Sequence, residues 1–208
     1  MNKLILIIFF YIYNTFGSNN TDSFYTKEYT QLDFPIFNQY QIIEFFSFYC
    51  TYCYQFDEIY KIDLNIKKQL IEKDKFMKYH VDFLGSMGKE LTIAWAIAIF
   101  FKIDEKISPI LFQKVQNISN PITEMDILSI FASFGINKEK YELAKNSFSV
   151  KCFLKKQYDI EEKLNLKSIP TILVNNQFII NNDAIHANSI ENYTKKYINI
   201  INHLLSNG

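Results

Sequence analysis

The spacing of apolar residues changes twice in the first part of the chain. Residues 41–48 form a short apolar run with one acid inside it, and its length and aromatic content predict a buried strand. Apolar side chains then recur at helical spacing from Cys53 onward, so we expect a helix to begin at or near Cys50. Residues 76–83 alternate between the two faces of a second strand. Together these segments predict a βαβ unit.

The middle of the chain has helical spacing only. Pro109, Pro121 and Gly135 divide this block, and they favour ends of helices. The helical segments that we expect cover residues 91–101, 110–115, 125–134, 138–148 and 150–164.

The last part of the chain returns to strands. Residues 171–174 and 177–180 predict a β-hairpin, because Asn175 and Asn176 between them tolerate the positive φ of a two-residue turn. A final amphipathic helix is expected over residues 190–205.

This order of elements predicts an α/β fold with an inserted all-helical domain. We expect residues 18–84 and 165–208 to form the α/β core and residues 85–164 to form the insertion.

The first seventeen residues have the pattern of a signal peptide, with Lys3 before an apolar run over residues 4–13 and small residues near its end. A permanent membrane anchor is the alternative, but a helix needs roughly 20 apolar residues to cross a bilayer. We therefore expect residues 1–17 to be removed on export and the mature protein to be periplasmic.

Composition and charge exclude several classes of protein. Apolar residues make up 49% of the chain, which excludes a disordered protein and a small domain held together by disulfides. The 22 basic residues balance the 22 acidic ones, so nothing in the net charge attracts nucleic acid.

Cys50 and Cys53 lie at the predicted junction between strand and helix. One helical turn brings sulfurs at this spacing within disulfide reach, and the first sulfur lies over the unpaired N–H groups at the start of the helix. A thiolate is stabilised there, which favours the reduced pair and makes the disulfide an oxidant. We expect Cys50 to be the exposed sulfur of low pKa and Cys53 to be its buried resolving partner.

Two other interpretations of the pair stay open. A structural disulfide is one, although a bridge that closes so short a loop stabilises a fold only slightly. A zinc site is the other, but Cys152, His80, His186 and His203 do not supply a matching second pair of ligands. We expect no metal or cofactor. Cys152 is expected to be an incidental thiol, with an intermolecular disulfide as the alternative.

Longer stretches around this pair resemble the DsbA family of bacterial periplasmic thiol oxidases. The resemblance covers nearly all of the expected mature chain and implies a thioredoxin-like fold with a helical insertion. Its specific stretches are EFFSFYCTYCYQF at 44–56, KYHV at 78–81, GKELTIAWA at 88–96, NSF at 146–148, IPT at 169–171 and VN at 174–175.

The resemblance implies roles for four further residues. Pro170 matches the proline that is cis in this fold and faces the disulfide, leaving the backbone of Ile169 free to pair with a substrate peptide. Glu44 matches a buried acid that exchanges a proton with Cys53, and a salt-bridged structural acid is the alternative. Lys78 matches the lysine paired with that acid, although a solvated surface charge would fit its strand equally well.

The sequence departs from the family at Thr51 and Tyr52, which we expect to contact substrate. The best-known members carry Pro and His there. Tyr52 removes a side chain that can place positive charge beside Cys50, whereas Thr51 restores a backbone N–H. We expect the loss of charge to dominate and the pair to be less oxidising.

The expected reaction is donation of the Cys50–Cys53 disulfide to unfolded exported polypeptides with reduced cysteines. By resemblance, a DsbB-like membrane protein would reoxidise the pair, and the chain would act as a monomer. A disulfide reductase or isomerase is one alternative, although isomerases of this fold commonly carry an extra dimerisation module for which no segment is spare. A non-catalytic peptide-binding holdase is the other. The sequence also contains His80 and Trp95, which we expect to be packing residues.

Overall fold

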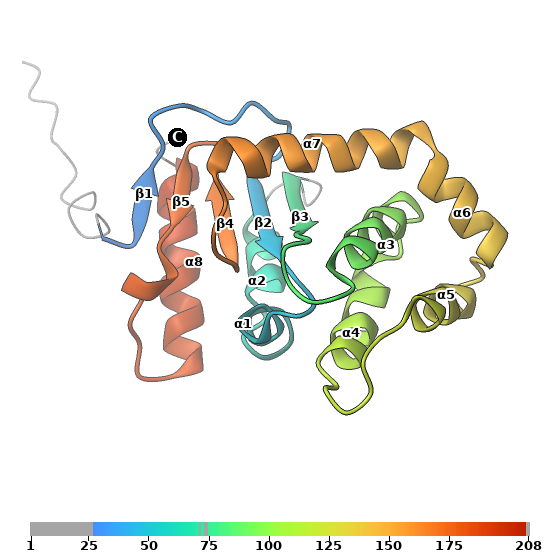
Figure 1. Ribbon diagram of the computed structural model, residues 1–208. Helices are drawn as coiled ribbons and strands as arrows, with labels where there is room; N and C mark the ends of the chain where they lie inside the picture. The colour runs from blue at the N-terminus through green and yellow to red at the C-terminus, as the bar shows by residue number, and fades with distance from the viewer. Residues whose placement is uncertain (1–26, 71, 73–74, 207–208) are drawn as a thin grey trace, which may run out of the picture.

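The computed structural model describes residues 27–70, 72 and 75–206, so the predicted signal peptide lies outside it. A mixed sheet of five strands in the order β1-β5-β4-β2-β3 occupies the centre of the molecule (Figure 1). The strands are β1 (Tyr29–Gln31), β2 (Ile42–Phe46), β3 (Phe76–His80), β4 (Thr171–Val174) and β5 (Phe178–Ile180).

Both predicted supersecondary units are present. β2 and β3 are parallel and are joined through helices, which confirms the βαβ unit. β4 and β5 are antiparallel, and Asn175 and Asn176 between them have φ of 47° and 62°, which confirms the hairpin turn. β1 was not predicted, because three edge residues with a mostly exposed pattern carry no periodic signal.

Helices cover both faces of the sheet, and alternate residues of the central strands enter the two cores. α2 (Ile62–Gln69) and α8 (Ile190–Ser206) pack on the face that carries Ile42 of β2. α7 (Phe148–Leu164) covers the face that carries Ile43 and Phe45. The central strands are therefore buried on both sides, which explains why their sequence is continuously apolar.

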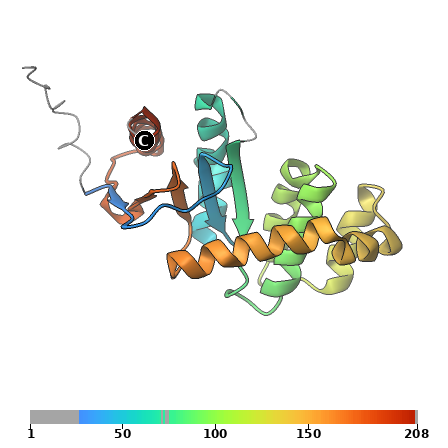
Figure 2. The ribbon, with the colours of Figure 1, turned by 90° about the horizontal axis from the view of Figure 1, so that it is seen from above.

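The helical block lies in the chain between β3 and β4. Its helices are α3 (Gly88–Phe100), α4 (Asp104–Val115), α5 (Glu124–Ser133), α6 (Lys138–Asn146) and α7. α7 runs from the far end of this block back across the sheet (Figure 2). The expected boundaries of the insertion at residues 85 and 164 stay a prediction.

α4 differs most from its prediction, since it starts at Asp104 instead of residue 110. Pro109 was expected to lie near an end, but it lies inside the helix. Side-chain caps explain the other ends: Thr123, Asn137 and Ser147 each accept a hydrogen bond from a backbone N–H of the helix that follows.

The predicted alternation of β3 gives an incomplete picture, because both of its faces are covered. α3 packs against this strand, and Trp95 Nε1 donates a hydrogen bond of 2.8 Å to the carbonyl of Lys78. Trp95 is a core residue, as predicted. Lys78 and His80 are buried, so the interpretation of Lys78 as a solvated charge is wrong.

The helix expected after Cys50 is present but broken. α1 (Thr51–Tyr54) is followed by the π-helix η2 (Gln55–Ile59), and Lys61 then takes a left-handed conformation with φ of 52° before α2 begins. Apolar spacing cannot reveal such a break, because the wider turn still keeps Phe56 in the core. Among the described residues, no helix combines the length and apolar character that crossing a bilayer requires.

Candidate active site

Cys50 lies at the N-cap of α1, directly after the turn that follows β2. Its backbone N–H donates to the carbonyl of Ser47 at 3.0 Å, which closes the turn. Its Sγ accepts a hydrogen bond from the backbone N–H of Cys53 at 3.1 Å. Both cysteines are free thiols in this structure, and Cys53 is fully buried as expected. The expectation that Cys50 is exposed is wrong, because Cys50 is only 8% exposed between the helical block and the Ile169 loop.

The two sulfurs have opposite electrostatic surroundings. The Cys53 side chain and the backbone N–H groups of Cys53 and Tyr52 donate to Cys50, and they lower the pKa of Cys50 to about 7 against the opposing effect of burial. Burial, followed by the hydrogen bond to Cys50, raises the pKa of Cys53 far above its usual range. At neutral pH the structure therefore favours one thiolate at Cys50 and a protonated Cys53.

The residues between the cysteines point outward, and Tyr52 is 72% exposed. Thr51 Oγ1 donates to Gln116 Oε1 at 3.3 Å, while Gln116 Nε2 donates to the carbonyl of Phe48 at 2.7 Å. Gln116 follows the last residue of α4, so the helical block bonds to both sides of Cys50. Nothing in the sequence pattern singled out Gln116.

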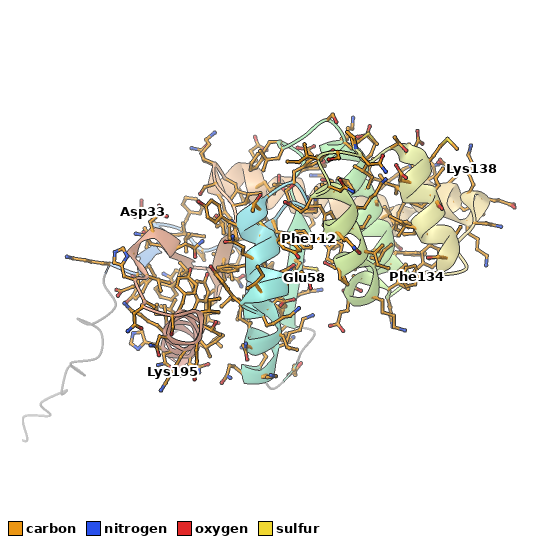
Figure 3. All side chains as sticks on the ribbon, turned by 90° about the horizontal axis from the view of Figure 1, so that it is seen from below. Asp33, Glu58, Phe112, Phe134, Lys138 and Lys195 are labelled. Carbon is orange, nitrogen blue, oxygen red and sulfur yellow. The ribbon has the colours of Figure 1, made fainter. Side chains whose placement is uncertain are left out.

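Aromatic packing reinforces this contact between the helical block and the cysteine helix. Phe112 of α4 lies beside the helices that follow Cys50 (Figure 3). Its ring centroid is 4.8 Å from that of Phe48 and 5.8 Å from that of Tyr54. The insertion therefore forms one wall around the pair.

The loop before β4 forms the opposite wall. The Ile169–Pro170 peptide bond is cis, and the thiol of Cys50 points toward the carbonyl of Ile169, with 3.8 Å between Sγ and O. The structure thus brings together residues 50 and 169, which the sequence separates by 119 positions. A groove of about 950 Å³ runs past this loop, and its lining includes Tyr52, Ile169, Pro170 and Tyr193.

Beneath Cys53 lies a cluster of buried charged side chains. Glu44 of β2 is fully buried, and its Oε2 lies 3.4 Å from Lys78 Nζ of β3 without forming a geometric hydrogen bond. Lys78 also pairs with Asp57 of η2, and Asp63 lies 4.0 Å away. Cys53 is close enough to Glu44 for this carboxylate to contribute to its raised pKa.

Burial shifts the acids of this cluster toward neutrality. It raises the pKa of Glu44 to about 8 and that of Asp57 to about 6, against the opposing charge of Lys78. Burial alone would lower the pKa of Lys78, but Asp57 and Glu44 outweigh it and raise that pKa. Glu44 is consequently both ion-paired and able to titrate near neutral pH.

Asp57 was not identified from the sequence, although a signal existed. It lies four residues after Cys53 and three before Tyr60, on the stripe that the helical spacing assigns to the core. An acid on a buried stripe requires a partner, and Lys78 is that partner. A cavity of about 280 Å³ borders the cluster and is lined by Asp57, Asp63 and Lys78 among others.

The remaining chemically active side chains do not join the site. His80 is buried, accepts from the backbone N–H of Phe48 at 3.1 Å and contacts Thr92 Oγ1 at 2.8 Å. Burial lowers its pKa to about 3, so it is neutral and structural, as predicted. Cys152 is exposed on α7. Within the described part of the chain, no three His, Cys, Asp or Glu side chains are grouped so as to hold a metal ion.

Comparisons with known proteins agree with this arrangement. The family model of the DSBA-like thioredoxin domain matches residues 41–191. A protein of Yersinia pestis named thiol:disulfide interchange protein DsbA is 42% identical over 180 residues, which cover 86% of this chain and 87% of that protein.

Solved structures give the same answer. The crystal structure of the disulfide oxidoreductase DsbA from Proteus mirabilis superposes with a TM-score of 0.80 at 38% identity, covering 87% of this chain and 96% of the other. A Cys-to-Ser form of that protein, solved with the non-covalently bound peptide PWATCDS, has a TM-score of 0.81 at 38% identity and covers 87% and 97%. These matches confirm the predicted thioredoxin-like fold with a helical insertion, and the chain belongs to the family of DSBA-like thioredoxin domains.

Proposed function

We propose that this chain donates the Cys50–Cys53 disulfide to unfolded, exported polypeptides that carry reduced cysteines. Thiol:disulfide exchange is the chemistry of the family, and the chain is an oxidoreductase of this kind. The observation that carries the proposal is the contrast between the two sulfurs: the pKa of Cys50 is lowered to about 7, while that of Cys53 is raised.

The reaction follows from that contrast in two displacements. A substrate thiolate attacks Cys50 Sγ, the Cys50–Cys53 bond breaks, and Cys53 leaves and takes up a proton. The second substrate thiolate then attacks the substrate sulfur of the mixed disulfide and displaces Cys50 as a thiolate. The substrate gains a disulfide and loses two electrons, and the enzyme ends as the dithiol.

The pKa of Cys50 sets the strength of this oxidant. Only ionisation at ambient pH stabilises the reduced form, and a pKa of about 7 leaves the thiol half ionised at pH 7. That stabilisation is about 0.4 kcal/mol, or about 10 mV for two electrons. We therefore expect the pair to be a moderate oxidant.

The buried cluster supplies the proton for Cys53. Glu44, with its pKa raised to about 8, holds a proton at neutral pH and lies close to the leaving sulfur. Lys78 keeps the second carboxylate, Asp57, charged and in place. In this proposal Glu44 is the proton donor and acceptor, and Lys78 is a supporting residue.

The substrate peptide lies in the groove beside Ile169 and Pro170, with Thr51 and Tyr52 at its rim. An extended peptide pairs with the backbone of Ile169, which brings its cysteine to Cys50. The Proteus mirabilis relative that was solved with a bound peptide supports peptide binding by similarity. We further propose that the chain acts as a periplasmic monomer and that a DsbB-like membrane protein reoxidises it.

A disulfide reductase or isomerase is the second candidate, and one observation favours it. A Cys50 pKa of about 7 stabilises the dithiol only slightly, so the pair could also work in the reduced state. Both candidates use the same residues and differ in the redox state that substrates meet.

The equilibrium of the purified protein with reduced and oxidised glutathione tests the proposal, together with turnover on a reduced, unfolded protein. An oxidase has a readily reduced disulfide and forms substrate disulfides, and Cys50→Ser abolishes that turnover. Cys152→Ser is the matched control and retains full turnover, because Cys152 lies on the surface of α7. A disulfide that is reduced only under strongly reducing conditions would contradict the proposal, as would Cys50→Ser retaining turnover.

A further inference from the structure

The loop that faces Cys50 has a separate partner for each of three successive carbonyls. Thr171 Oγ1 donates to the carbonyl of Ser168 at 2.7 Å. The carbonyl of Ile169 faces the Cys50 thiol at 3.8 Å. The carbonyl of Pro170 accepts a hydrogen bond of 2.7 Å from Asn182 Nδ2. Two of these bonds brace the loop on either side of Ile169 and leave its carbonyl directed at the reacting sulfur.

Asn182 continues the hairpin ladder with its side chain. The register of β4 and β5 pairs Leu173 with Ile179 and Val174 with Phe178, and extending it places Asn182 opposite Pro170. β5 ends at Ile180, and the chain turns into the 3₁₀ helix η4 (Asn182–Ala184). The amide of Asn182 therefore gives the Pro170 carbonyl the donor that a longer β5 would have supplied.

A hydrogen bond to its oxygen fixes the orientation of the Asn182 amide. Tyr197 of α8 donates from its hydroxyl to Asn182 Oδ1 at 3.0 Å, so the Nδ2 end must face the Pro170 carbonyl. Tyr197 is fully buried, and its ring packs edge-on against Phe56 of η2 with 5.1 Å between centroids. The loop is thus connected through the side chains of Asn182 and Tyr197 to η2, which directly follows the cysteine helix α1.

We propose that Asn182 is a positioning residue for peptide substrates: by holding the Pro170 carbonyl, it keeps the Ile169 backbone where a substrate strand pairs beside Cys50. This inference rests on the proposed function and adds a residue to it. The effect is selective, because only a substrate with a peptide backbone uses Ile169. A small dithiol reaches the Cys50 sulfur without that pairing.

The test compares two substrates for the oxidised full-length protein. One is a reduced dithiol peptide and the other is dithiothreitol, and the measurement is the ratio of their second-order rate constants in single turnover. Loss of one internal hydrogen bond corresponds to about a tenfold change, so Asn182→Ala should lower the ratio about tenfold. Tyr197→Phe removes only the hydroxyl behind Asn182 and should lower the ratio about threefold. The double variant should match Asn182→Ala, because Tyr197 acts through Asn182.

Asn175→Ala is the matched control. Asn175 Nδ2 donates to the carbonyl of Leu204 at 2.8 Å, so this variant also loses one side-chain bond to a backbone carbonyl, in the turn between β4 and β5. It should unfold more easily yet retain the wild-type ratio. If Asn182→Ala does not fold, Tyr197→Phe decides the question alone.

The outcomes separate the two proposals. Wild-type protein that fails to oxidise the peptide contradicts the proposed function itself. Two results would overturn the role of Asn182 and leave the proposed function intact, provided that the wild-type protein oxidises the peptide. One is a folded Asn182→Ala variant with the wild-type ratio of rate constants, and the other is an equal fall of that ratio in Asn175→Ala.

Discussion

The two sides of the cysteine pair differ in how they use charge. The mouth, defined as Cys50, Thr51, Tyr52, Ile169 and the adjoining groove, is held by hydrogen bonds and aromatic packing, and Asp183 is the only charged residue among the described residues that line the groove. The floor, defined as Glu44, Asp57 and Lys78 beneath Cys53, consists of buried ionisable side chains.

This difference assigns separate tasks to the two sides. In the proposed function, a mouth with one charged residue suits peptides of varied sequence, because pairing with the Ile169 backbone does not depend on the peptide's side chains. A buried, charged floor instead holds protons near neutral pH, because burial moves carboxyl pKa values upward. Substitutions in the floor should therefore alter stability and pH dependence, and substitutions in the mouth should alter rates and potential.

The largest effect is expected from Lys78→Met. Removing the cation leaves the Asp57 carboxylate buried without a counter-charge, and breaking a buried pair in this way costs about 3–5 kcal/mol. Denaturant unfolding measures the loss. The control is Lys155→Met, which removes an exposed helical ion pair with Asp159 and should change stability little. If Lys78→Met and Lys155→Met lost equal amounts of unfolding free energy, the buried ion pairs of the floor would be worth no more than an exposed one.

Glu44→Gln should flatten the dependence of stability on pH. The folded-state pKa of Glu44, about 8, lies above its ordinary value of 4.5, so the folded protein binds more protons than the unfolded chain between these values. The stability linked to this proton is fully present below about pH 4.5 and is lost as pH rises through about 8. The variant should thus exceed wild type in stability at pH 8 by a few kcal/mol. The free energy of unfolding is measured from pH 5 to pH 8 for both proteins. A constant difference between wild type and variant over this range would contradict a raised pKa.

Tyr52→His should strengthen the oxidant without affecting the floor. An imidazolium beside Cys50 favours its thiolate, and lowering the Cys50 pKa by about one unit makes the pair about 20 mV more oxidising at pH 7. The glutathione equilibrium measures this shift. Tyr52→Phe retains the ring without a charge and should leave the potential unchanged. A potential that does not respond to His would show that side-chain charge at the mouth has no influence on Cys50.

The smallest effect is expected where the helical block contacts the mouth. Thr51→Val and Gln116→Leu each remove the hydrogen bond between these side chains, which is worth under about 1 kcal/mol because it is exposed. A double-mutant cycle on the glutathione equilibrium should give a coupling of less than about threefold. A coupling above tenfold would mean that the insertion controls the pair and does not merely border it.

The sequence predicted most of the fold because its signals were local. Apolar runs, helical spacing and the Asn175–Asn176 turn each reflect a nearby physical constraint, and each corresponds to an element of the structure. The short edge strand β1 and the π-helix η2 escaped prediction. One depends on pairing with distant β5, and the other changes the turn width without changing which residues are buried.

The site divides in the same way. Cys50 and Cys53 could be chosen from spacing alone, whereas Pro170, Glu44 and Lys78 required the family resemblance because no local pattern assigns them a role at the pair. Gln116 and Asn182 could not be found, since their roles consist of hydrogen bonds between segments that only the fold brings together. Asp57 could have been found, as an acid on a buried helical stripe.

Titration of the reduced protein by thiolate ultraviolet absorbance, in a Cys152→Ser background, tests the contrast between the two sulfurs most directly. One thiolate should form with a midpoint near pH 7 at Cys50, and Cys53 should not ionise in the same range. A first midpoint near the ordinary value of 9.0, or two thiolates that form together, would contradict that contrast.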